Sequence, residues 1–140
     1  MRLVLDTNVV ASGLLWNGAP AQLLDAAKLG EIELFTSPFL LAELSGIFMR
    51  TKFAKAIAAT GLPRAELVLG YAELSIMVRP ETISPAIEAD PDDDEVLACA
   101  LAAAADLIVS GDKHLHGLGG QYRGMRIVTP AQAAGIIALR

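Results

Sequence analysis

The sequence predicts an α/β fold in three layers, in which a central parallel sheet of about four to five strands is covered by helices on both faces. Short aliphatic runs such as RLVL at 2–5 and LIV at 107–109 are typical of parallel strands that are buried on both faces. Such runs alternate with longer segments of helical periodicity. Strands that alternate with helices form right-handed βαβ units on a parallel sheet.

Each further element has its own signal. Apolar runs rich in β-branched residues predict additional strands at 32–36, 76–80 and 125–129. Helical periodicity predicts helices at roughly 19–29, 38–49, 52–60, 63–76, 94–105 and 130–138. The Ser-Pro pair at 37–38 and the Thr-Pro pair at 129–130 each offer an N-cap followed by proline at the first helical position. The Gly-Leu-Pro stretch at 61–63 separates two helices.

Size and composition favour one domain spanning 1–140. A chain of 140 residues with 54% hydrophobic residues can bury a core without disulfide or metal staples. The single cysteine, Cys99, lies among alanines and leucines, so we expect a reduced, buried thiol in a cytoplasmic protein. No apolar stretch reaches the ~20 residues that a membrane helix needs. The net charge of −5 argues against nucleic-acid binding by bulk electrostatics, unless the acids bind divalent cations.

Two aspartates follow predicted strands at matching positions. Asp6 comes directly after the run at 2–5, and Asp112 follows the run at 107–109 closely. Ligands of open parallel sheets gather outside the carboxyl ends of the strands, so we expect both side chains to face one crevice. The alternative is that each aspartate only caps the helix or turn that follows it.

An acidic cluster precedes the apolar helix predicted at 94–105. Its six acids fall within eight residues: Glu88, Asp90, Asp92, Asp93, Asp94 and Glu95. Asp92 and Glu95 have the spacing of a capping box. Capping leaves Asp93 and Asp94 unexplained, because close like charges are destabilising unless a cation or solvent relieves them.

Glu43 lies at the edge of the apolar stripe of the helix predicted at 38–49. A carboxylate at a buried margin needs a partner, although a boundary glutamate is also ordinary. Together with the aspartates it would make a site of three to five carboxylates without sulfur or imidazole, since His114 and His116 are expected in a surface loop. Such oxygen ligands suit one or two Mg²⁺ or Mn²⁺ ions and hydrolysis of a phosphodiester.

Four segments, in this order, resemble the PIN domain family, especially the bacterial PIN proteins that are toxins of toxin–antitoxin pairs. They are LVLDTNVVASGLL, SPFLLAEL, DPDDDEVLACALAAAADLIVSGDKHL and IVTPAQAAGII. The resemblance implies a small α/β/α nuclease fold and a metal-dependent endoribonuclease. It also implies a homodimer and a small antitoxin protein as partner.

The resemblance further implies an acidic quartet made of Asp6, Glu43, Asp112 and one aspartate at the start of the helix after the acidic cluster. The DPDDDEVL segment places that aspartate at Asp93, whereas the spacing of other PIN toxins favours Asp94; both are kept as catalytic and metal-binding candidates. The remaining matches, Asn8 and Ser110, are polar positions that the family keeps beside the site. They would orient the carboxylates or a metal-bound water.

Arg50, Lys52 and Lys55 follow the helix that carries Glu43. We predict that they form a phosphate-contacting rim for RNA, with a solvated helix face as the alternative.

Three other functions compete with this interpretation. A phosphatase of the haloacid dehalogenase type carries a second aspartate two residues after the first, where this chain has Asn8. A receiver domain normally carries its acidic pair after the first strand, whereas here the acidic cluster comes late. The third alternative is a PIN-like domain that processes RNA, or one that binds RNA or a partner without cutting.

Overall fold

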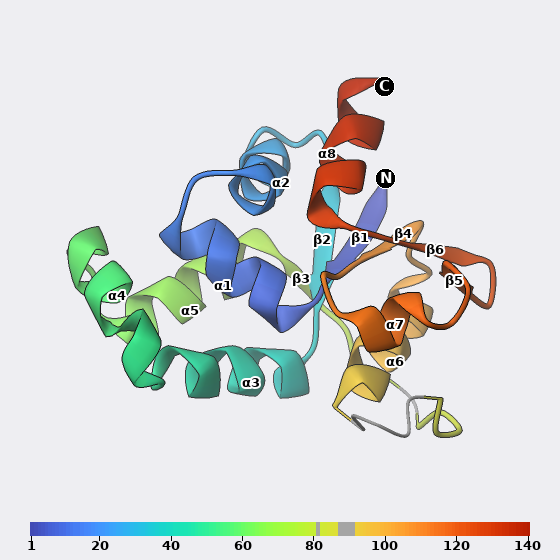
Figure 1. Cartoon of the computed structure of the whole chain (residues 1–140), viewed down its shortest axis with the longest axis horizontal. Helices are drawn as coiled ribbons and strands as arrows, with labels where there is room; N and C mark the ends of the chain where they lie inside the picture. Colours follow the sequence, from blue (N-terminus) through green and yellow to red (C-terminus); the bar gives the residue numbers. More distant parts are fainter. Residues whose placement is uncertain (81, 87–91) are drawn as a thin grey trace.

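The computed structural model describes residues 1–80, 82–86 and 92–140, and it contains a mixed sheet flanked by helices (Figure 1). The strands in this part of the chain are β1 (Arg2–Leu5), β2 (Glu33–Thr36), β3 (Ile76–Met77), β4 (Leu107–Val109), β5 (Gln121–Tyr122) and β6 (Met125–Val128). The helices are α1 (Thr7–Leu15), α2 (Ala19–Lys28), α3 (Pro38–Phe48), η1 (Thr51–Phe53), α4 (Ala54–Thr60), α5 (Arg64–Leu74), α6 (Asp93–Ala103), α7 (Lys113–His116) and α8 (Pro130–Ala138).

The strand order is β3-β2-β1-β4-β6-β5. The first five strands in that order are paired in parallel, with Leu5 opposite Val109 in the β1–β4 register, and this confirms the predicted parallel sheet. These five parallel strands of the described residues agree with the expected count of about four to five. The sixth strand is β5, a two-residue antiparallel partner of β6.

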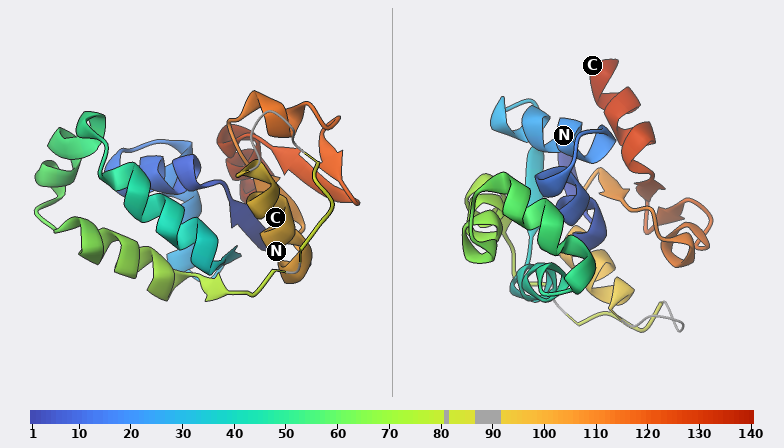
Figure 2. Two further views of the ribbon diagram at one scale, coloured as in Figure 1. Left: turned by 90° about the horizontal axis from the view of Figure 1, so that it is seen from below. Right: turned by 60° about the vertical axis from the view of Figure 1, so that its left-hand side comes forward.

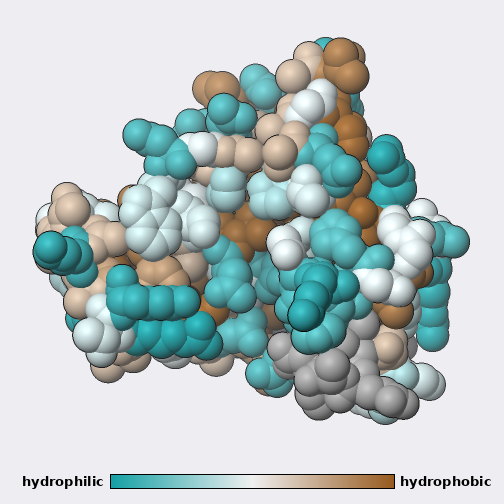
Figure 3. All heavy atoms as spheres, in the orientation of Figure 1, coloured by the Kyte–Doolittle hydropathy of each residue, from teal (hydrophilic) through white to brown (hydrophobic). Residues whose placement is uncertain are grey.

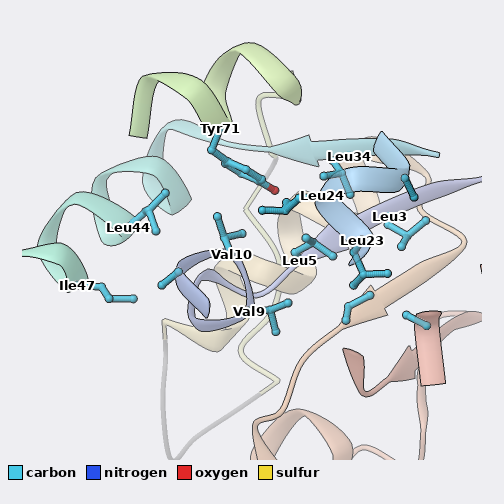
Figure 4. Close-up of a cluster of buried hydrophobic side chains, with 14 of the residues drawn as sticks. Leu3, Leu5, Val9, Val10, Leu23, Leu24, Leu34, Leu44, Ile47 and Tyr71 are labelled. Carbon is cyan, nitrogen blue, oxygen red and sulfur yellow. The ribbon is translucent and has the colours of Figure 1, made fainter. Parts of the chain in front are cut away.

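Alternating side chains of the strands divide the core into two halves, as a sheet covered on both faces requires. Leu3, Leu5 and Val109 belong to a cluster with α1, α2, α3, α5 and α8, and Figure 4 shows part of it. Val4 and Ile108 point to the other face and pack with α6 and α7. The views in Figure 2 agree with this three-layer arrangement, which confirms the predicted fold class.

Local signals set several helix ends. The Ser37 side chain accepts a hydrogen bond from the Leu40 backbone N–H at 3.3 Å, so it caps α3 as predicted. Thr129 and Gln132 form a reciprocal capping box at the start of α8. Gly61 ends α4 with φ of 72°, a conformation that glycine adopts without strain.

Two helices were missed by the sequence analysis. α1 begins immediately after Asp6, in a segment whose valines, threonine and glycine have low helix propensity; the helix forms because Val9, Val10 and Ala11 are buried in the core. α7 lies in the stretch that was expected to be a surface loop, and it is a single turn anchored by the fully buried Leu115. Among the described residues, no helix is both long and apolar enough to cross a bilayer.

Candidate metal centre

Asp6 is a buried carboxylate at the carboxyl end of β1. The Asp6 backbone N–H donates to the Val109 carbonyl oxygen at 2.8 Å, which continues the β1–β4 ladder. The residue as a whole is only 5% exposed. Burial raises the pKa of the Asp6 carboxyl above its ordinary value. The hydrogen bond from Ser110 opposes that rise, whereas the nearby charge of Asp112 adds to it. Asp6 is therefore held in a place where a cation would offset the cost of its charge.

Ser110 links the two strand ends. It is fully buried, its hydroxyl donates to Asp6 Oδ2 at 2.7 Å, and the same hydroxyl oxygen accepts from the Asp112 backbone N–H at 2.9 Å. One side chain thus orients the first aspartate and the backbone that carries the second. The hydrogen bond to Asp6 is of the kind expected for Ser110, whose role in orienting metal ligands stays a prediction. Asn8, the other predicted supporting residue, is exposed in the first turn of α1.

His116 supports Ser110 from the other side. Its Nε2 lies 2.7 Å from the Ser110 carbonyl oxygen. Because a carbonyl oxygen only accepts, the imidazole N–H is the donor in this bond. The expectation that His116 lies in a surface loop was wrong, since its ring is partly buried at the end of α7 and holds the backbone that leads to Asp112.

Asp93, Asp112 and His114 converge between α6 and α7. Each offers one ligand atom, and these atoms all lie within 4.8 Å of one another. Asp93 is buried at the first position of α6, Asp112 is partly buried before α7, and His114 is exposed. His114 Nδ1 lies 3.3 Å from Asp112 Oδ1, and the His114 backbone N–H donates to the same oxygen at 2.7 Å. An imidazole thus lies beside the carboxylates, where none was expected from the sequence.

The remaining acids of the cluster before α6 take different places. Asp94 Oδ1 accepts a hydrogen bond from the Ala86 backbone N–H at 3.1 Å, so this carboxylate contacts the segment at 82–86. The predicted capping box is not formed, because the Asp92 side chain makes no capping hydrogen bond to α6. Glu88 and Asp90 lie outside the described residues. Asp93, Asp94 and Glu95 share the first turn of α6, where the helix dipole favours negative charge.

Glu43 lies on α3, and the basic residues lie in the segment that follows this helix. Glu43 is half-buried on α3, a helix that contacts both α1 and α6. Arg50, Lys52 and Lys55 are exposed around η1 and α4, beyond the end of α3 that lies far from α6 (Figure 1). Their roles in metal and RNA binding stay predictions.

The donor set fits a divalent cation. Carboxylates of Asp93 and Asp112 and the nitrogen of His114 are hard or borderline ligands, and no thiolate takes part because Cys99 is fully buried in the core. Burial raises the pKa of the Cys99 thiol to about 12, and the charge of Glu95 adds to this rise. The arrangement can hold an ion against the buried edge formed by Asp6 and Ser110.

The family model described as PIN domain matches residues 2–114, which is most of the chain. The chain belongs to the PIN domain family. Members are in general metal-dependent nucleases, and the match covers Asp6, Glu43, Asp93 and Asp112. No curated protein and no solved structure gives a significant match.

Two histidines of this PIN domain were given no role by the sequence analysis. Both His114 and His116 lie within four residues of Asp112, and this spacing is the feature of the sequence that could have pointed to them. The spacing becomes informative only when residues 113–116 are known to form the single helical turn α7. That turn carries His114 to the acids and His116 to the Ser110 carbonyl.

Proposed function

We propose that this PIN domain is a Mg²⁺- or Mn²⁺-dependent endoribonuclease that hydrolyses RNA phosphodiester bonds with one or two bound ions. The observation that carries the proposal is the convergence of Asp93, Asp112 and His114 next to the buried pair Asp6 and Ser110. The family membership supports a metal-dependent nuclease in general. RNA as the substrate, and Mg²⁺ or Mn²⁺ as the ion, are the parts that the proposal adds.

The chain's own residues would divide the work as follows. Asp93 and Asp112 would hold the ion, and Asp6, whose carboxylate accepts a hydrogen bond from Ser110, would face it from the buried edge. Glu43 and Asp94 are proposed as further catalytic carboxylates, and Asn8 as a group that orients a water. When bound, the ion would lower the pKa of an attacking water and offset charge on the phosphoryl oxygens.

Arg50, Lys52 and Lys55 are proposed to contact RNA phosphates away from the cleaved bond. All three are exposed, so they can reach a ligand without rearrangement of the core. The 11 residues of α3 span roughly 16 Å, so a strand of a few nucleotides lying along this helix could contact both regions. A local basic rim of this kind is compatible with the overall charge of −5.

We further propose that the protein is the cytoplasmic toxin of a toxin–antitoxin pair, neutralised by a small antitoxin protein, and that it forms a homodimer. The toxin role is supported by the sequence resemblance to bacterial PIN toxins. The homodimer is supported by apolar surface around α8 (Figure 3). Leu139, directly after α8, is 90% exposed, and Leu29, directly after the neighbouring α2, is 74% exposed. Sedimentation of the wild type and of Leu139→Glu would test this surface; a monomeric wild type would overturn the dimer.

The central test is cleavage of labelled single-stranded RNA by the purified full chain. We expect cleavage with Mg²⁺ or Mn²⁺, none after chelation with EDTA, and none by Asp6→Asn with either ion. Asp25→Asn is the matched control, because Asp25 is an exposed aspartate on α2 whose nearest cation is Lys28 at 4.0 Å. Equal cleavage with and without EDTA would overturn the metal mechanism.

Two further measurements separate the competing functions. Toxicity on expression that a small protein encoded immediately upstream relieves would support the toxin role. Harmless expression of an active nuclease would favour RNA processing instead. Stable phosphorylation of an aspartate by a small phosphodonor would favour a receiver domain and contradict the nuclease proposal.

A further inference from the structure

His114 stands against the acids of the candidate metal centre without filling any part of the core. Its side chain is 40% exposed, and its Nδ1 is 3.3 Å from Asp112 Oδ1. Asp93 contributes the third donor of the group, within 4.8 Å of the other two. The backbone of His114 is fixed as well, because its N–H donates to Asp112 Oδ1 at 2.7 Å. Asp112 therefore holds the imidazole beside the carboxylates, and the two side chains could bind one ion together.

We propose that His114 is a nitrogen ligand of the divalent ion and that it gives this centre a preference for Mn²⁺ over Mg²⁺. The inference rests on the proposed metal-dependent function, and it adds the identity of the ion and a ligand of a different chemical type from the carboxylates.

The separations between the donor atoms suit one shared ion. In an octahedral shell with bonds of about 2.1 Å, neighbouring ligand atoms lie ~3.0 Å apart and opposite ones ~4.2 Å apart. The 3.3 Å between His114 Nδ1 and Asp112 Oδ1 corresponds to neighbouring positions. The ligand atom of Asp93 lies within 4.8 Å of the other two, which is slightly beyond the distance between opposite positions. Small side-chain rotations on the exposed side of the centre would complete the fit.

Ligand chemistry gives the preference between the two ions. Mg²⁺ favours oxygen ligands and retains much of its water, whereas imidazole binds transition metals more readily. A set of two carboxylates and one imidazole keeps the hard oxygens that Mn²⁺ accepts and adds a nitrogen that Mg²⁺ gains little from. His114 should therefore strengthen binding of Mn²⁺ much more than binding of Mg²⁺.

The test replaces the nitrogen by an oxygen at nearly the same position. In His114→Asn, the amide oxygen can take the place of Nδ1, and the substitution leaves the core untouched because the position is exposed. Lys113→Ala is the matched control, because Lys113 is the exposed neighbour on the same helical turn. Each full-length protein is freed of metal, its fold is checked by thermal melting, and Mn²⁺ and Mg²⁺ are titrated separately by calorimetry. Pulsed electron paramagnetic resonance of the Mn²⁺ form then detects nitrogen coupling.

We expect the wild type and Lys113→Ala to bind Mn²⁺ more tightly than Mg²⁺ and to show nitrogen coupling to the Mn²⁺ ion. His114→Asn should lose the coupling and weaken Mn²⁺ binding on the order of tenfold, with Mg²⁺ binding nearly unchanged. Coupling that persists in His114→Asn, or an equal loss of affinity for both ions, would overturn the role of His114 and leave the metal-dependent nuclease intact. A wild type that binds neither ion would instead overturn the proposed function itself.

Discussion

The junction after β1 and the junction after β4 both place an aspartate at the same edge of the sheet, yet the two aspartates differ in exposure. Asp6 directly precedes α1, is 5% exposed and accepts a hydrogen bond from the Ser110 hydroxyl. Asp112 follows two intervening residues, including the exposed Gly111, and its side chain is 28% exposed. One carboxylate is thus enclosed by the core, while the other is open to a ligand that arrives from solvent.

The largest effect of breaking the link between the two junctions is expected from Ser110→Ala. This change removes the donor to Asp6 Oδ2 and the acceptor of the Asp112 N–H together. We expect Mn²⁺ affinity and RNA cleavage to fall on the order of a hundredfold, the upper end for groups that orient metal ligands. Thermal melting should show a loss of only about 1 kcal/mol in unfolding free energy. Ser45→Ala, an exposed serine on α3, is the control, and unchanged cleavage by Ser110→Ala would show that the junctions act independently.

A smaller effect is expected at His116, which contacts only the junction after β4. Replacement by Met or by Gln gives side chains of similar volume, but only Gln offers an N–H that can donate to the Ser110 carbonyl oxygen. We expect His116→Met to lower kcat about tenfold with KM unchanged, the low end for supporting groups, and His116→Gln to restore most of it. Equal rates for the two variants would mean that the ring only fills space.

The smallest effect concerns stability on the β1 side. Burial raises the pKa of Asp6 in the folded state, so protonation stabilises the folded protein. That contribution is present below the unfolded value of 3.8 and is lost as pH rises through the folded pKa. Asp6→Asn never ionises, so without metal it should melt a few degrees above the wild type at neutral pH. The difference should disappear at pH below 3.8, and a variant that melts lower at neutral pH would contradict the account.

The sequence was sufficient for the parts that depend on strong local patterns. Buried aliphatic runs located β1 and β4, so Asp6 and Asp112 could be predicted at one edge of the sheet. Serine and threonine caps followed by proline fixed the starts of α3 and α8.

Tertiary packing decided what the sequence could not. α1 has a helix-poor composition and forms because its apolar side chains are buried, and α7 is too short to leave a periodic pattern. The choice between Asp93 and Asp94 depends on the rotation of α6, where one residue changes direction by about 100°. In the structure that rotation brings Asp93 to Asp112 and Asp94 to the Ala86 backbone.

The most direct test of the central claim is a calorimetric titration of Mn²⁺ into the wild type, Asp93→Asn and Asp94→Asn. The two variants make the same chemical change at adjacent positions of one helical turn, so a difference between them reports the position of the side chain and not the kind of substitution. We predict that the wild type binds Mn²⁺, that Asp94→Asn retains most of the affinity, and that Asp93→Asn loses it. Loss of binding in Asp94→Asn with full binding in Asp93→Asn would contradict the proposed centre.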